Sequence, residues 1–233
     1  MTSSMWRRLL PVAVLLLGLA LFFLLGLQRY FSFEALSRHH ATLTSWVAAN
    51  RGVAEFVFVA AYIAVVSFSL PASILMSTLS GFLFGTWLGA ALSVCSASIG
   101  ATVIFFAART AFRDLFLARA GTALLRLEAG FRRDSFSYLL VLRLLPLFPF
   151  WMVNVVAALL GMPPKRFMLA TAVGIVPGAC VYAGLGSGFG LLIDKGEAPD
   201  LGIIFQWQIF GPLLGLAVLS LLPVLYSRWK ARR

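Results

Sequence analysis

Apolar runs of about twenty residues recur along this chain, and that is the length a helix needs to cross the hydrocarbon core of a bilayer. Only 12% of the residues are charged, about half of the share that is usual in soluble domains. Short basic clusters separate the runs, which is typical of polytopic membrane proteins. The runs cover residues 9–27, 53–70, 89–108, 167–185 and 203–225. We therefore predict an all-α, polytopic helical membrane protein whose first run is an uncleaved N-terminal helix.

The formal net charge of +11 comes from clusters of Lys and Arg between the runs and at the C-terminus. Basic loops of membrane proteins lie on the cytoplasmic side, where they also meet anionic lipids. No nucleic-acid-binding motif accompanies the charge, so we expect no nucleic acid partner. The cluster between residues 109 and 133 and the basic tail at residues 228–233 predict a cytoplasmic C-terminus. We expect a multi-pass protein of a cell membrane, of the bacterial inner-membrane kind.

Two further apolar stretches are broken. Residues 71–89 are too short to cross independently and are interrupted by Gly81 and Gly85. Residues 137–160 contain Pro146 and Pro149, and two prolines three residues apart break a helix. Because irregular backbone at membrane depth persists only where protein or a wet cavity covers it, we predict two opposed re-entrant helical hairpins. The halves 71–109 and 143–186 then form an inverted repeat, as in many transporters.

Arg143 lies inside the second broken stretch, with Asn154 beyond the two prolines. A charge within an apolar segment is costly, so it usually has a partner and a function. Arg143 could satisfy backbone carbonyls freed by the break, or it could hold a lipid phosphate with help from Asn154. Arg109 is expected at the cytoplasmic mouth of such a site.

Small residues recur every four positions from residue 81 to residue 101. On one continuous helix they would form a ridge that lets another backbone approach closely. This ridge could serve ordinary helix packing, or it could line a groove for a lipid. Its members are Gly81, Gly85, Gly89, Ser93, Ala97 and Ala101.

Glycines, prolines and arginines are ordered and spaced over residues 55–190 in a pattern that resembles the VTT domain of the SNARE-associated Golgi proteins, relatives of the DedA proteins. The matching positions are Pro71, Gly81, Gly85, Gly89, Gly100, Phe105, Arg109, Arg143, Pro146, Pro149, Asn154, Phe167, Gly174, Pro177, Tyr182 and Gly186. The resemblance implies a polytopic protein with two opposed re-entrant hairpins. It also implies that the protein moves or scrambles phospholipids or polyprenyl-phosphate carriers.

This chain departs from the family pattern at two places. Val155 and Ala158 replace the usual aromatic residue and glycine of the second hairpin, and residues 56–113 contain no carboxylate. DedA proteins proper carry acidic residues in or beside the first hairpin, where they are thought to couple to protons. The chain therefore resembles the Golgi-protein branch more closely, and proton coupling is doubtful.

The sequence disfavours an enzyme. The only histidines, His39 and His40, are adjacent and diverge on a helix, and Cys95 and Cys180 are too few for a metal cluster. We expect no cofactor or metal, and we expect membrane lipids as partners, either anionic phospholipid or polyprenyl phosphate, with a homo-oligomer also possible. A small-solute or anion transporter and a non-transporting assembly factor stay open as alternatives.

The chain divides into three parts on these grounds. Residues 1–52 form an N-terminal transmembrane anchor and interfacial segment, and residues 53–190 form the core with both hairpins. Residues 191–233 form a C-terminal transmembrane helix and a basic tail. The candidate lipid-binding residues are Arg143, Asn154, Arg109, Pro146, Pro149, Gly81 and Gly85.

Overall fold

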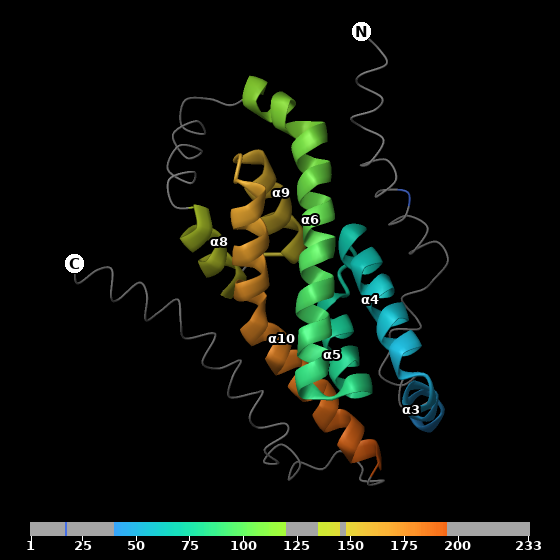
Figure 1. The fold of residues 1–233 in the computed structure, drawn as a ribbon. Helices are drawn as coiled ribbons and strands as arrows, with labels where there is room; N and C mark the ends of the chain where they lie inside the picture. The colour runs from blue at the N-terminus through green and yellow to red at the C-terminus, as the bar shows by residue number, and fades with distance from the viewer. Residues whose placement is uncertain (1–16, 18–39, 120–134, 145–147, 195–233) are drawn as a thin grey trace, which may run out of the picture.

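A computed structural model describes residues 17, 40–119, 135–144 and 148–194 (Figure 1). Within these ranges every regular element is a helix, which confirms the all-α prediction. The expected first and last membrane runs, 9–27 and 203–225, lie outside the described residues. The helices are α3 (His40–Ala49), α4 (Arg51–Ser67), α5 (Ser73–Phe84), α6 (Thr86–Arg119), α8 (Ser135–Leu144), α9 (Phe150–Leu159) and α10 (Pro164–Asp194).

Two long helices, α6 and α10, run antiparallel through the middle of the molecule and pack on each other (Figure 1). The apolar stretches Thr86–Phe112 and Pro164–Gly190 are each 27 residues long, enough to cross a membrane. Stacking of the Phe105 and Phe167 rings, with centroids 4.3 Å apart, joins the two helices. Helix α10 begins at Pro164, where the missing N–H costs nothing, and it continues through Pro177.

Three of the described helices are too short to cross alone. They are α5, with 12 residues, and α8 and α9, with 10 residues each. Helices α3 and α4 are also bent by 112° at their junction, and this pair counts as a third crossing only if it is taken as one broken span. The predicted run 53–70 is therefore not a crossing by itself, because α4 ends at Ser67 after 17 residues. The described part of the chain thus contains two helices, or up to three, that could span a membrane.

The breaks occur at residues that favour them. The turn between α4 and α5 contains Ser69, whose φ of 57° is unusual for a residue other than glycine, followed by Pro71. Helix α5 ends at Gly85, whose φ of 78° is a conformation that glycine adopts without strain. The prediction of one continuous ridge from residue 81 to residue 101 is therefore wrong. The chain reverses at Gly85, which places Gly81 on α5 and the later small residues on α6.

The short helices flank the long pair at opposite ends. Helix α5 packs on the lower parts of α6 and α10, whereas α8 packs on α10 and α9 on α6 in the upper part (Figure 1). Gly81 makes the close approach of α5 to α10 possible, since a Cβ there would overlap the backbone carbonyl of Ala183. Gly186 does the same from α10, against the carbonyl of Thr78.

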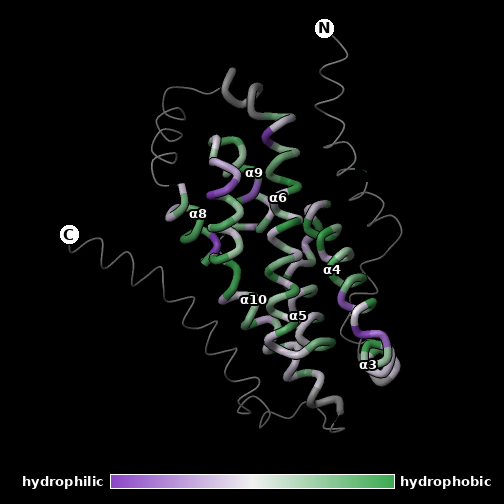
Figure 2. Tube along the Cα trace, viewed as in Figure 1, coloured by the Kyte–Doolittle hydropathy of each residue, from purple (hydrophilic) through white to green (hydrophobic). Residues whose placement is uncertain are grey.

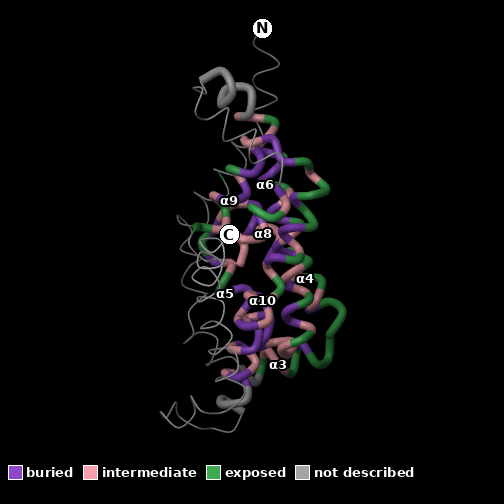
Figure 3. Tube along the Cα trace, turned by 90° about the vertical axis from the view of Figure 1, so that its left-hand side faces the viewer, coloured by how far each residue is buried: buried purple, intermediate pink, exposed green. Residues whose placement is uncertain are grey.

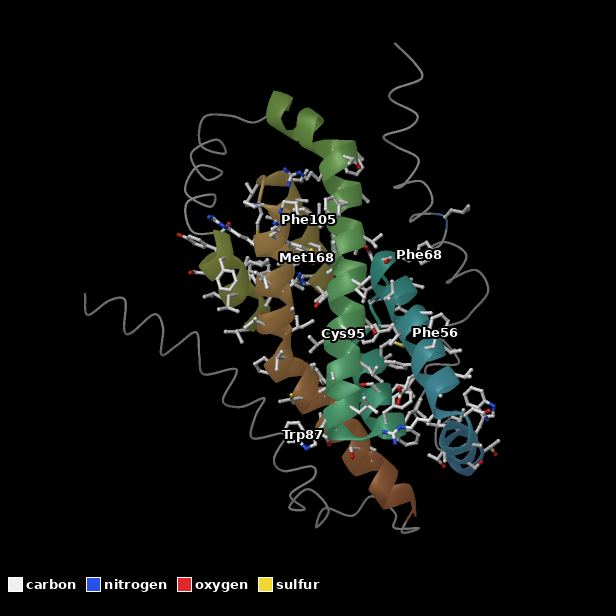
Figure 4. All side chains as sticks on the ribbon, in the orientation of Figure 1. Phe56, Phe68, Trp87, Cys95, Phe105 and Met168 are labelled. Atoms are coloured by element: carbon white, nitrogen blue, oxygen red, sulfur yellow. The ribbon has the colours of Figure 1, made fainter. Side chains whose placement is uncertain are left out.

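The outer surface of this bundle is apolar. Trp87 is 82% exposed and Phe56 is 75% exposed, and both point away from the bundle (Figure 4). Hydropathy is high along most of the long helices, with hydrophilic stretches near the junction of α3 and α4 and toward the upper end of α6 (Figure 2). The outer edge of α4 is largely exposed, whereas much of the interior is buried (Figure 3). Such a surface suits hydrocarbon rather than water.

Candidate functional site

Arg143 lies in the last turn of α8 and reaches between α9 and α10. Its Nη2 donates hydrogen bonds to Asn154 Oδ1 on α9 and, at 3.1 Å, to Thr171 Oγ1 on α10. The guanidinium carbon also lies 4.3 Å from the centroid of the Phe150 ring and 5.8 Å from that of Phe167. Three helices therefore position this single side chain.

Gly174 on α10 provides the space for Arg143. A Cβ at this glycine would lie 2.6 Å from Arg143 Cβ and 3.1 Å from its Cγ. Real carbon atoms do not approach this closely, so α8 can pack on α10 at this level only because position 174 has no side chain.

The positive charge of Arg143 has no carboxylate partner among the described side chains. Glu55 is the one acidic side chain that the structure describes, and it pairs with Arg51 at 3.1 Å on α4. Nε and Nη1 of Arg143 and Nδ2 of Asn154 are buried and find no hydrogen-bond acceptor in the described ranges. A buried cation without a counter-ion is costly, so an anion at this position would be stabilised.

Arg143 lines a cavity of about 470 Å³ whose lining residues come from α4, α5 and α6 and from α8, α9 and α10. Helices α4, α5 and α6 contribute one wall, which includes Tyr62, Ser77 and Ser93. The other wall is formed by α8, by α10, and by the N-terminal part of α9 with the two residues before it. Ile74 and Phe148, which are 54% and 48% exposed, also line the cavity and connect it to the apolar surface. A volume of this size is typical of a small-molecule or head-group site.

A cluster of hydroxyl groups occupies the wall formed by α4, α5 and α6. Tyr62 Oη lies 2.8 Å from both the backbone oxygen of Ser73 and Ser77 Oγ. Ser80 Oγ lies 2.7 Å from the backbone oxygen of Ser77 and 2.8 Å from Ser93 Oγ. This cluster was not predicted from the sequence. The spacing of Ser73, Ser77 and Ser80 could have indicated it, because this spacing places three serines on one face of a helix.

The structure brings some of the predicted site residues together and separates others. Arg143 and Asn154 are in contact, and Pro149, at the start of α9, lines the cavity beside Arg143. Gly81 packs against α10 and Gly85 ends α5, and neither is among the lining residues. Pro146 lies outside the described residues.

Arg109 lies apart from this cavity. Its Nη1 donates to the backbone oxygen of Met162 at 2.9 Å, which ties α6 to the turn between α9 and α10. The expectation that Arg109 marks the cytoplasmic mouth of the site stays a prediction, but its observed contact is one that holds helices together.

Comparisons with known proteins agree on one family. The family model of the VTT domain matches residues 70–188. The chain is similar to the Transmembrane protein 41 homolog of Caenorhabditis elegans, at 28% identity over 171 residues that cover 72% of this chain and 67% of the relative. It is also similar to human Transmembrane protein 41B, at 28% identity over 174 residues that cover 73% of this chain and 58% of the relative. No solved structure matches.

Several of these relatives are considerably longer than the matched region. The match to the Transmembrane protein 41 homolog of Drosophila melanogaster, at 28% identity over 182 residues, spans 76% of this chain and only 55% of the relative. The relatives therefore carry further sequence outside the part that they share with this chain.

Proposed function

The chain belongs to the VTT domain family, which includes the SNARE-associated Golgi and DedA proteins, and we propose that it moves lipids between the leaflets of a bilayer. The protein is not an enzyme in this proposal. Its partners are membrane lipids with an anionic phosphate, either phospholipid or polyprenyl phosphate. It resides in a cell membrane with its basic C-terminus in the cytoplasm, as the positive-inside rule favours.

The observation that supports this proposal best is the charge of Arg143 on the cavity wall. A guanidinium presents several N–H donors in a planar array that matches phosphate oxygens. Arg143 uses only Nη2 for its described hydrogen bonds, and Nε and Nη1 have no described acceptor. A lipid phosphate would supply both the missing counter-charge and the missing acceptors.

The arrangement of the short helices supports a path across the membrane. The proposed hairpins are α4–α5, which opens toward the lower end of the bundle, and α8–α9, which opens toward the upper end (Figure 1). The first of them differs from the sequence prediction, which placed a separate crossing at residues 53–70 and the hairpin at residues 71–89. They would form an inverted repeat whose broken segments meet near the bilayer midplane, where transporters place their binding sites. The cavity lies between these two halves.

The exposed rim of the cavity explains why a lipid fits better than a free solute. Ile74 and Phe148 line the cavity and are exposed on the apolar surface. A lipid held at Arg143 by its head group would pass its acyl chains between these residues into the bilayer. The tails would then stay in hydrocarbon throughout the movement, while the cavity would shield the charged head group, whose passage through hydrocarbon is the main cost of transfer.

We would test the proposal in liposomes that carry fluorescent phospholipids and the purified protein. A membrane-impermeant reductant quenches the outer-leaflet fluorescence, and lipid movement exposes the inner-leaflet lipids as well. We expect the wild-type protein to lose well over half of the signal. Arg143→Ala should slow the movement at least about tenfold, which corresponds to a loss of only about 1.4 kcal/mol in transition-state binding.

Arg51→Ala is the matched control, because it removes an arginine of the surface pair with Glu55. It should move lipid at the wild-type rate. Normal movement by a folded Arg143→Ala protein would remove Arg143 from the site. A wild-type signal that stops at the outer-leaflet half would reject movement of these phospholipids, and flux of a small anion in the same liposomes would then identify an anion transporter.

A further inference from the structure

The hydroxyl cluster has a definite donor direction because each hydroxyl has one hydrogen to donate. The backbone oxygen of Ser73 can only accept, so the hydrogen of Tyr62 is used in that 2.8 Å bond. In the contact between Tyr62 Oη and Ser77 Oγ, also 2.8 Å, Ser77 must therefore be the donor. Ser77 is left with acceptor lone pairs.

The same reasoning applies to the second pair. Ser80 donates to the backbone oxygen of Ser77 at 2.7 Å, so its own hydrogen is used. Ser93 must then donate in its 2.8 Å contact with Ser80 Oγ. Ser93, like Ser77, can offer only acceptor lone pairs to a ligand.

The cavity is consequently polarised. Ser77 on α5, Ser93 on α6 and Arg143 on α8 all line it. Arg143 has donors and no acceptor, whereas the two serines present acceptors and no free hydrogen. Ser73 and Tyr182 also line the cavity, and their hydroxyls can act in either direction, so they do not cancel this polarity.

We propose that the cavity selects phospholipids whose head group carries an N–H or O–H donor beyond the phosphate, with the phosphate toward Arg143 and the donor toward Ser77 and Ser93. This inference rests on the proposed lipid movement. Phosphoethanolamine and phosphoglycerol have both features. Phosphocholine has a quaternary ammonium with no N–H, and polyprenyl phosphate has no second polar group.

The physical basis of the selection is the cost of unmatched acceptors. A site built to bond a donor rejects an analogue that lacks it, because the buried polar groups of the site lose their water and gain no partner. The three methyl groups of phosphocholine would also separate its charge from the serine oxygens. Adding methyl groups one at a time to an ethanolamine head group therefore separates the loss of the last N–H donor from the gradual increase in size.

The test is the liposome assay with four acyl-labelled lipids: phosphatidylethanolamine, its N-methyl and N,N-dimethyl derivatives, and phosphatidylcholine. Labelling the acyl chain keeps the head group unchanged. We expect the largest drop at the last methylation, which removes the final N–H, with phosphatidylcholine moved at least about fivefold more slowly than the dimethyl lipid. An even decline along the series would indicate exclusion by size and would overturn the proposal.

Ser77→Ala and Ser93→Ala should each change the selectivity. The rate of movement of the dimethyl lipid divided by that of phosphatidylcholine should fall toward one. Ser96→Ala is the control, since Ser96 is buried on the same helix as Ser93 but donates to the Leu92 carbonyl of that helix at 2.7 Å and does not line the cavity. It should keep the wild-type ratio. A wild-type ratio in folded forms of both cavity variants would overturn the assignment to these serines.

The outcomes separate this inference from the proposed function. Equal rates for all four lipids, with Arg143→Ala inactive, would reject the selectivity and keep lipid movement. If the wild-type protein moves none of them, lipid movement is rejected. The selectivity is then measured by native mass spectrometry of the purified protein mixed with equimolar dimethyl lipid and phosphatidylcholine. Equal amounts of the two lipids bound to the protein would overturn the proposed selectivity.

Discussion

Arg143 is the residue on which most contacts of the site converge. Its Nη2 bonds Asn154 and Thr171, its guanidinium lies over Phe150, and its stem fits the space left by Gly174. These contacts fix the direction of the side chain while Nε and Nη1 keep unused donors. The arrangement suits a residue that the protein holds in place and whose positive charge a bound anion would balance.

Replacing Thr171 with Val tests this positioning. Thr171 is fully buried and accepts from Arg143 at 3.1 Å, so the change removes one acceptor and keeps the side-chain shape. We expect a loss of about 1–3 kcal/mol in the free energy of unfolding, measured by denaturation in detergent, together with slower lipid movement.

Thr102→Val is the matched control for Thr171→Val. The Thr102 hydroxyl bonds the Ser98 carbonyl of its own helix at 2.7 Å and contacts no other element through that bond. Its replacement should leave both stability and lipid movement close to wild type. Equal stability of the wild-type and Thr171→Val proteins would show that the Arg143 contact is not part of the native energetics.

At the scale of elements, α5 is a short helix that depends on its neighbours. Its 12 residues are too few for independent stability, and it lies against both α6 and α10. The contact with α10 is backbone against backbone, with Gly81 facing Ala183 and Gly186 facing Thr78. Small residues at such contacts are how membrane helices pack without a hydrophobic driving force.

Gly186→Ala should separate α5 from α10. The added methyl group would overlap the Thr78 carbonyl, and overpacking of this kind costs about 1–3 kcal/mol or more. We expect a lower unfolding temperature in detergent. Gly190→Ala on the same helix is the control, because its nearest contact would be the Phe82 carbonyl at an ordinary 3.6 Å. Equal unfolding temperatures for the two variants would contradict the close packing.

At the scale of the whole molecule, the site depends on the packing of α4, α5 and α6 against α8, α9 and α10. Helix α5 of the first half packs on α10, and α9 of the second half packs on α6. The cavity that results has a cationic wall from one half and a hydroxyl wall from the other. Arg143 comes from α8, whereas Ser77 and Ser93 come from α5 and α6, so the site needs helices from both parts of the bundle.

Filling the cavity should therefore stop lipid movement without unfolding the protein. Gly178 on α10 lines the cavity, and no atom lies within 4 Å of the position that its Cβ would take. We expect Gly178→Phe to slow lipid movement about tenfold or more at an unchanged unfolding temperature, since a phenyl ring occupies a large part of a head-group site. Gly178→Ala should stay active. Full activity of the Phe variant would exclude this cavity from the path.

The local features of the fold could be predicted from the sequence because their causes are local. Apolar run length predicts a crossing helix, and the long helices α6 and α10 contain the expected runs 89–108 and 167–185. Breaks near Pro71, Gly85 and Pro149 follow from backbone restrictions that act within one or two residues. Arg143 stood out because a charge is rare in such a segment.

Only the tertiary structure decided what these residues contact. It joined Arg143 to Thr171 and gathered Tyr62, Ser77 and Ser93 into one wall of a cavity. It also assigned Gly81 to helix packing and Arg109 to a bond with the Met162 carbonyl. Each of these contacts links residues from different helices, and their pairing depends on how the helices pack, which the pattern within a single helix does not specify.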